Sequence, residues 1–203
     1  ELLARIRALL RRSEGGEAPV ENQRRLEFGP LVIDSAMREA WLRGEVDVPA
    51  EHLFTEQVKG ILRTAIGVRS TAARGRPAVL LTTFPEEQHA LGLLMVEATL
   101  VSEGTACLSL GARTPMADLG RAAVENAIDV VGVSFSGAFP ARQAIDRLLE
   151  LRAMLPPQIA LWAGGAAVRG KQKRLPGVRV VADLDDTRQA LAEWRSAHLP
   201  ARA

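Results

Sequence analysis

The sequence contains almost no cysteine and no long apolar segment. Its single cysteine, Cys107, excludes an internal disulfide and a thiolate metal cluster, and is typical of a reducing compartment. No apolar run approaches the roughly 18–20 residues that a membrane-spanning helix needs. The first twelve residues alternate Arg with Leu and Ala and do not resemble a signal peptide. We therefore expect a cytoplasmic protein with no membrane partner, in which Cys107 is an inert thiol.

The charges are nearly balanced, so the composition does not require a polyanionic partner. Twenty-six Lys and Arg residues against 24 Asp and Glu residues leave a formal net charge of +2. Hydrophobic residues make up 47% of the 203 residues and charged residues 25%, which is enough to bury a core and excludes a disordered polyampholyte. This length suits one large domain or two modest ones of roughly 100 residues.

Residues 1–70 show helical periodicity and no strand pattern. Apolar residues recur there at spacings of three and four, and Gly and Pro separate the periodic segments. We expect four helices, over residues 1–12, 21–27, 31–43 and from residue 50 to 63 or beyond. Their short connections predict an antiparallel four-helix bundle.

From residue 76 the pattern changes to short apolar runs that alternate with amphipathic segments. The runs predict strands at 77–83, 105–110, 129–134, 159–163 and 178–181. The segments between them predict helices at 86–102, 116–126, 139–154 and 185–196, with a short helix after the fourth strand. Such alternation is typical of an α/β fold, here a Rossmann-like (flavodoxin-like) five-stranded parallel sheet over residues 76–197. Residues 68–76 are expected to form a polar, flexible linker.

In a sheet of this kind, ligands bind at the carboxyl ends of the strands. Glu87, His89 and Gly92 follow the first strand. A carboxylate can hold one ring nitrogen of a histidine and raise the basicity of the other, as suits a metal ligand, and a glycine lets a flat group approach the backbone. A lone histidine near a helix start is more often an ordinary polar residue. Here, however, hydroxyls and glycines follow the later strands and form a narrow slot for a nucleotide-like ligand: Ser134, Ser136, Gly137, Gly164 and Gly165.

This order of motifs, E-x-H-x-x-G, a serine and then Gly-Gly, resembles the cobalamin-binding Rossmann domains. The resemblance implies cobalamin bound with its dimethylbenzimidazole tail displaced, His89 as the lower axial cobalt ligand and Glu87 as its hydrogen-bond partner. It further implies that Ser134 contacts the tail base and that Gly164 and Gly165 line its slot. Leu110, Gly111 and Pro115 match the L-G-x-x-x-P corrin-facing loop of the family, whereas Ser136 stands where the commonest pattern has leucine.

Trp41, followed after nine residues by Glu51 and His52, resembles the signature of the CarH-like photoreceptor regulators of the MerR type. The resemblance implies that these three residues surround the adenosyl group of adenosylcobalamin on the upper corrin face. It also implies a light-dependent homo-oligomer, no substrate turnover, and DNA binding only through an upstream domain, in agreement with a first residue that is not Met. Core packing for Trp41 and a solvated helix start for Glu51 and His52 are the plain alternatives.

One residue departs from the family pattern. In members whose cobalt carries two histidines after illumination, the upper histidine directly follows the signature tryptophan, and that position here is Leu42. The histidines of this chain are His52, His89 and His198. The upper ligand after illumination is therefore expected to be water, or His52 after a shift.

Three other functions are weighed against this interpretation. A corrinoid methyl-carrier protein that serves a methyltransferase shares the bundle and the histidine motif, but has no adenosyl group to recognise. A mutase cobalamin subunit is disfavoured because no substrate barrel is present. Residues 165–171 match G-x4-G-K, yet Gln172 replaces the Ser or Thr that a phosphate loop needs for magnesium.

We expect Trp162 and Trp194 to be packing residues.

Overall fold

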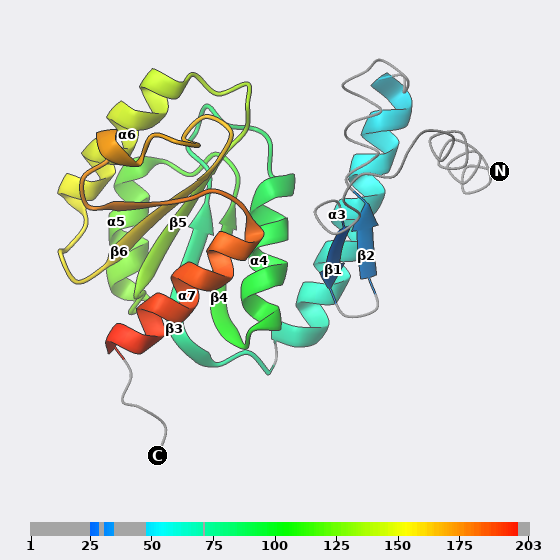
Figure 1. The fold of residues 1–203 in the computed structure, drawn as a ribbon, viewed down its shortest axis with the longest axis horizontal. Coiled ribbons are helices and arrows are strands. Elements are labelled where there is room, and N and C mark those ends of the chain that lie inside the picture. The colour runs from blue at the N-terminus through cyan, green and yellow to red at the C-terminus, as the bar shows by residue number, and fades with distance from the viewer. Residues whose placement is uncertain (1–24, 29–30, 35–47, 71, 199–203) are drawn as a thin grey trace, which may run out of the picture. The chain divides into compact units, whose positions relative to one another are not determined.

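The computed structural model describes residues 25–28, 31–34, 48–70 and 72–198, with side-chain environments from Thr55 onward. The chain divides into two compact units, Glu1–Glu51 and His52–Ala203. The first unit contains a two-stranded antiparallel sheet, and the second contains a five-stranded sheet with its helices (Figure 1).

The small sheet pairs β1 (Arg25–Phe28) with β2 (Leu31–Asp34), and Phe28 lies opposite Leu31. The helices expected over 21–27 and 31–43 are therefore wrong where these strands lie, and the four-helix bundle is not confirmed. The β-branched Val32 and Ile33 favour a strand, and a two-residue Gly-Pro connection is the length typical of a hairpin. The first expected helix and the remainder of the third lie outside the described residues.

The last helix expected in this region is confirmed, and it begins two residues before the predicted start. α3 (Val48–Ser70) continues into the segment expected to be a linker, and a strand already begins at Gly75, so the prediction of a linker over 68–76 is wrong at both ends. Val58, Leu62 and Ile66 are buried, and their spacing of four residues places them on one stripe of the helix.

The five-stranded parallel sheet confirms the predicted α/β fold. Its order is β4-β3-β5-β6-β7, the flavodoxin-like order, in which successive strands are added on opposite sides of β3, so that the strand order reverses between β3 and β5. The observed bounds lie within two residues of those predicted: β3 (Gly75–Thr82), β4 (Thr105–Gly111), β5 (Val130–Phe135), β6 (Ala160–Gly165) and β7 (Val178–Val181).

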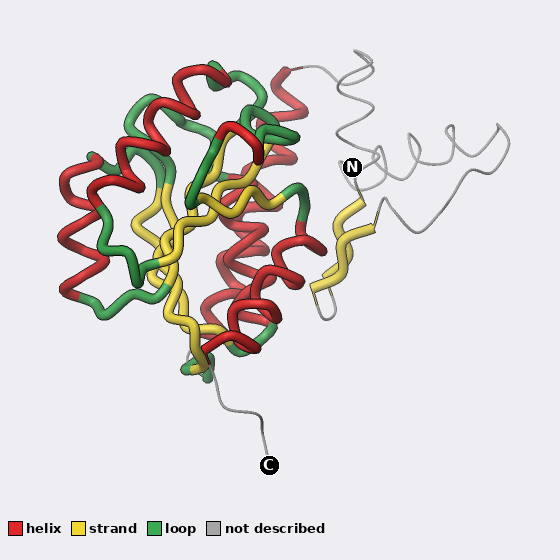
Figure 2. The backbone as a smooth tube through the Cα atoms, turned by 60° about the vertical axis from the view of Figure 1, so that its left-hand side comes forward, coloured by secondary structure: helices red, strands yellow, loops and turns green. Residues whose placement is uncertain are grey.

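Two helical layers cover the sheet (Figure 2). On one face, α5 (Met116–Glu125) and α6 (Ala141–Met154) contribute to the larger apolar cluster. On the other face, α4 (Leu91–Ser102) and α7 (Leu184–His198) form the smaller cluster, which includes Trp162 and Trp194, each 7% exposed. The packing roles predicted for both tryptophans are confirmed. A single 3-10 turn, Gln172–Arg174, stands where a short helix was expected after β6.

The structure corrects one boundary that matters for function. The helix predicted from residue 86 begins only at Leu91, so that Glu87 and His89 lie in a loop. The Glu87 carboxylate accepts the backbone N–H of His89, a local bond that competes with helix formation.

Candidate functional site

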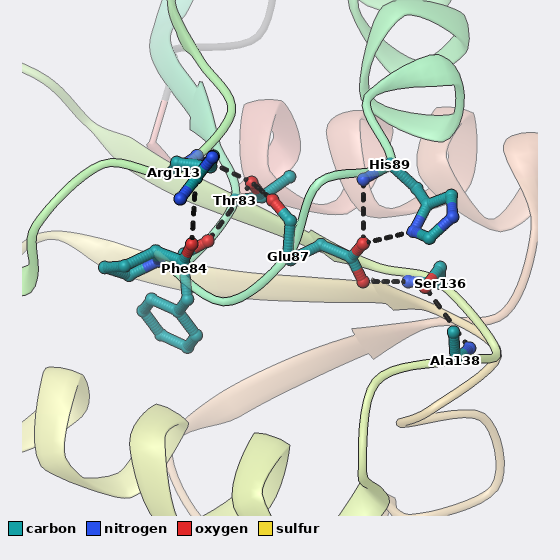
Figure 3. A network of polar contacts seen from close by, with 8 residues as sticks. Thr83, Phe84, Glu87, His89, Arg113, Ser136 and Ala138 are labelled. Carbon is teal, nitrogen blue, oxygen red and sulfur yellow. Dashed lines mark hydrogen bonds and ion pairs between the residues drawn. The ribbon is translucent and has the colours of Figure 1, made fainter.

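The loops that follow β3 and β5 meet at the point where the strand order reverses. Oε1 of Glu87 lies 2.7 Å from Nδ1 of His89 and accepts the backbone N–H of the same histidine at 2.8 Å. Oε2 of Glu87 accepts the backbone N–H of Ser136 at 2.7 Å, although 49 residues separate the two in sequence (Figure 3). One carboxylate thus holds both the histidine and the neighbouring loop.

The ionised state of Glu87 decides which nitrogen of His89 carries a proton. The Glu87 side chain is 2% exposed, whereas that of His89 is 66% exposed. Burial raises the pKa of Glu87, but the hydrogen bonds from His89 and Ser136 outweigh it and hold the pKa below its usual value. The ionised carboxylate can only accept, so Nδ1 of His89 must donate. In the neutral imidazole, Nε2 then presents its lone pair, as a metal ligand requires.

A network of threonines joins this loop to the turn after β4. Thr83, which is fully buried, donates its hydroxyl to the carbonyl oxygen of Glu87 at 2.8 Å and accepts the backbone N–H of Arg113 at 3.0 Å. The hydroxyl of Thr82 lies 2.8 Å from that of Thr114. Arg113 adopts a left-handed φ of 68°, and its guanidinium reaches the carbonyl oxygen of Pro85 at 3.3 Å. Sequence analysis missed this network, because buried threonines at a strand end carry no distinctive pattern.

Ser134 and the paired glycines lie side by side on adjacent strands. Ser134 pairs with Gly164 in the register of β5 and β6, and a β-carbon at Gly92 would lie 3.3 Å from the hydroxyl oxygen of Ser134. Gly165 has a left-handed φ of 103°, and a β-carbon there would overlap the carbonyl oxygen of Phe135. Only glycine fits at position 165, because the end of β6 lies directly against the backbone of β5 there.

The predicted corrin-facing residues lie at the end of β4 and between β4 and α5. Leu110 is 36% exposed, and Gly111 has a left-handed φ of 74°. Pro115 directly precedes α5. These residues lie in or beside the turn that the threonine network holds, and their contact with a ligand stays a prediction.

The residues predicted for the upper face are described less completely. Trp41 and Leu42 lie outside the described residues, and Glu51 and His52 are described only as part of the backbone of α3. Their roles stay predictions.

The phosphate-loop alternative loses support, and the expectation of an inert Cys107 gains support. Turns and a 3-10 turn follow β6, whereas a phosphate loop leads into a long helix. Burial, with the nearby Glu97 carboxylate, raises the pKa of the Cys107 thiol to about 12, as expected of an inert thiol.

The donor set fits a metal that brings most of its own ligands. Within the part of the chain that the structure describes, no group of three or more His, Cys, Asp or Glu side chains could hold a metal ion. A single exposed imidazole, oriented by a buried carboxylate, instead fits an axial ligand to a metal already held by a macrocycle. Cobalt in a corrin ring meets that requirement.

Comparisons with known proteins point to the same class of ligand. A family model for the B12 binding domain matches residues 77–192. The chain is 37% identical over 145 residues to the HTH-type transcriptional repressor CarH of Myxococcus xanthus, and 35% identical over 132 residues to the repressor CarA of that organism. These matches cover 71% and 64% of this chain but only 47% and 44% of the two relatives, so the chain spans less than half of their length.

Solved structures confirm the fold. A cobalamin-binding protein from Desulfitobacterium hafniense is 18% identical with a TM-score of 0.53, and the match covers 79% of this chain and 77% of that one. The monomethylamine corrinoid protein of Methanosarcina barkeri is 14% identical with a TM-score of 0.60, covering 78% and 77%. Among the described helices, none combines the length and apolarity needed to span a membrane.

Proposed function

Because the chain belongs to the B12-binding domain family, we propose that it is the cobalamin-binding, light-sensing module of a transcriptional regulator. The observation that carries this proposal is the Glu87–His89 pair at the carboxyl ends of the strands, in a chain 37% identical to a transcriptional repressor. The two curated relatives are named as repressors and not as enzymes. DNA binding would belong to a part of the protein outside this chain.

His89 would hold the cobalt from below through Nε2, while Glu87 keeps the opposite nitrogen protonated. Ser134, Gly164 and Gly165 would flank the displaced tail of the cofactor, because they line adjacent strand ends. When bound, adenosylcobalamin supplies a cobalt–carbon bond that light can break. The protein's own contribution is to keep the imidazole in the ligating tautomer and to leave room for the tail.

The residues predicted for the upper corrin face would respond to the state of the cofactor. Trp41, Glu51 and His52 would surround the adenosyl group, and α3, which carries two of these residues, extends to Ser70, close to the start of β3. Loss of the adenosyl group would leave these residues without their partner and change the association of copies of the chain. The homo-oligomer and its dependence on light are part of this proposal.

The experiment that tests the proposal is an absorption spectrum of the cobalamin-loaded protein, with size-exclusion chromatography, before and after green light. We expect the adenosylcobalamin spectrum to change irreversibly and the oligomeric state to change with it. Methylcobalamin serves as the control, because it lacks the adenosyl group. Cobalamin binding with no change of assembly on illumination would contradict the light-sensing function.

A corrinoid methyl-carrier protein is the second candidate, favoured by the structural similarity to the monomethylamine corrinoid protein. That similarity, at 14% identity, shows the fold alone. A methyl carrier should bind methylcobalamin and adenosylcobalamin with equal affinity, whereas a sensor should prefer the adenosyl form. Comparing the two dissociation constants therefore separates the candidates.

A further inference from the structure

We propose that Thr83 is a positioning residue, which holds the loop of Glu87 and His89 in register with the turn of residues 111–114. The inference rests on the proposed cobalamin-binding function. Thr83 would contact no cofactor atom. It would act through Glu87, and thereby set how well His89 is oriented for ligation.

The polar groups of Thr83 together bond two separate segments, the loop of Glu87 and the turn of residues 111–114. Its hydroxyl donates to the carbonyl oxygen of Glu87 at 2.8 Å, nearer than the carbonyl oxygen of Phe84 at 3.4 Å, and accepts the backbone N–H of Arg113 at 3.0 Å. Its own N–H donates to Gly111, and its carbonyl accepts the N–H of Thr114. The side chain is fully buried, so water does not replace these bonds.

The effect on His89 follows from the geometry of Glu87. The backbone of Glu87 is held on one side by its N–H, which donates to the carbonyl of Phe84 at 2.9 Å, and on the other by the Thr83 hydroxyl. The carboxylate of Glu87 extends from this fixed backbone to both N–H groups of His89. Without the hydroxyl, the carbonyl of Glu87 loses its partner, and the carboxylate can no longer hold the imidazole at one position.

The adjacent Thr82 offers a matched control. It is also fully buried, and its hydroxyl also bonds the turn, at 2.8 Å to Thr114 and 3.1 Å to the carbonyl of Gly111, with the carbonyl oxygen of Thr83 at 3.2 Å. The hydroxyl of Thr82 makes no hydrogen bond to Glu87 among the described residues. Replacing either threonine by valine loosens the turn, but only the replacement of Thr83 also frees the ligand loop.

The first measurement uses the full chain without cofactor. Nitrogen NMR at about pH 8.5, where an ordinary imidazole is neutral, reports which ring nitrogen of His89 carries the proton. We expect the unmodified protein, Thr82→Val and Thr83→Ser to keep the proton on Nδ1. Thr83→Val and Thr83→Ala should show a mixture of both tautomers, and having two variants guards against one that does not fold.

The second measurement uses the protein loaded with cobalamin and reduced to Co(II), whose electron paramagnetic resonance spectrum shows splitting by an axial nitrogen. We expect Thr83→Val to lower the ratio of histidine-ligated to histidine-free cobalt about tenfold, the lower end of the effects known for groups that orient a metal ligand. Thr83→Ser should restore the ratio, and Thr82→Val should leave it unchanged.

The outcomes separate this inference from the proposed function. An unmodified protein without histidine-ligated cobalt would contradict the proposed function, and the cofactor-free measurement would still decide the role of Thr83. Histidine ligation and tautomer that are the same in Thr83→Val as in the unmodified protein would overturn the inference alone. So would a Thr82→Val variant as impaired as Thr83→Val, because the effect would then belong to the turn and not to the ligand loop.

Discussion

Replacing Glu87 with glutamine tests the site most directly, because the change removes charge and one acceptor atom while keeping the shape. The carboxylate accepts three N–H groups, two from His89 and one from Ser136. A glutamine side chain has one oxygen and one NH2 group. Whichever way it points, the NH2 group faces an N–H donor at about the distance of a hydrogen bond, and at least one buried N–H loses its acceptor.

The magnitude follows from those bonds. A hydrogen bond to a charged group contributes about 1.5–3 kcal/mol, and a buried donor left unpaired costs about 1–3 kcal/mol. We expect Glu87→Gln to lower the free energy of unfolding of the cofactor-free protein by about 2–4 kcal/mol. Cobalamin affinity should fall about 10–100-fold, since the residue orients a metal ligand and does not itself bind the metal.

The loss should depend on pH in a defined direction. The pKa of Glu87 is lowered in the folded state, so the ionised carboxylate stabilises the fold above the unfolded pKa of about 4.3 and this contribution is lost as the pH falls through the folded-state value. Glutamine takes up no proton in this range. The difference in stability between the two proteins should therefore be full at about pH 7 and narrow below about pH 4.3.

Urea unfolding at several pH values measures this difference, and Glu86→Gln is the matched control. Glu86 is the adjacent residue, its carboxylate is 40% exposed, and it pairs with Arg147 at 3.2 Å. Its replacement should change stability by no more than about 0.5 kcal/mol. If Glu87→Gln unfolded like this control and bound cobalamin with unchanged affinity, the reasoning from the buried carboxylate would be refuted.

Four further predictions concern other parts of the site. His89→Ala should abolish histidine ligation in the cobalt spectrum and weaken cobalamin binding by more than the ~10–100-fold expected of residues that only orient the ligand. Trp41→Ala should reduce the preference for adenosylcobalamin over methylcobalamin, measured as a ratio of dissociation constants. Gly165→Ala should lower the free energy of unfolding by about 3 kcal/mol or more because of strain and overlap, whereas Gly120→Ala, with nothing within 4 Å of its β-carbon, should be neutral or slightly stabilising. Because Leu42 stands beside Trp41, illuminated protein should carry a water-ligated cobalt that cyanide or imidazole can displace; a spectrum with two axial nitrogens would contradict this, and Leu42→His should produce that spectrum.

The parts predicted well are those in which a local pattern has a single structural solution. The inner strands of the sheet are largely buried, so each contains a short apolar run, as in residues 130–133. Residues 25–34 were harder, because short segments such as Arg25–Phe28 satisfy a helical period as well as alternation. Only pairing with Leu31–Asp34 distinguishes the two, and that pairing depends on the turn between them.

The start of α4 was predicted too early, for a different reason. Residues 86–90 have a composition compatible with a helix, and periodicity placed them in one. In the structure, the Glu87 side chain accepts the His89 N–H, and the Thr83 hydroxyl accepts that of Arg113, 30 residues away. The sequence motif identified Glu87 and His89 but not the conformation that makes them a pair, because that conformation depends on bonds to distant segments.

Both oxygens of the Glu87 carboxylate are needed to hold His89 in place. The E-x-H motif alone would leave one carboxylate oxygen of Glu87 facing solvent, and a carboxylate held on one side orients a histidine poorly. Because β3 and β5 are neighbours in the sheet, the backbone N–H of Ser136 reaches the second oxygen. The helices that follow these two strands lie on opposite faces, so the strand ends stay open to a ligand. The reversal of strand order therefore does two things at once: it completes the support of the histidine and leaves the imidazole exposed above the sheet.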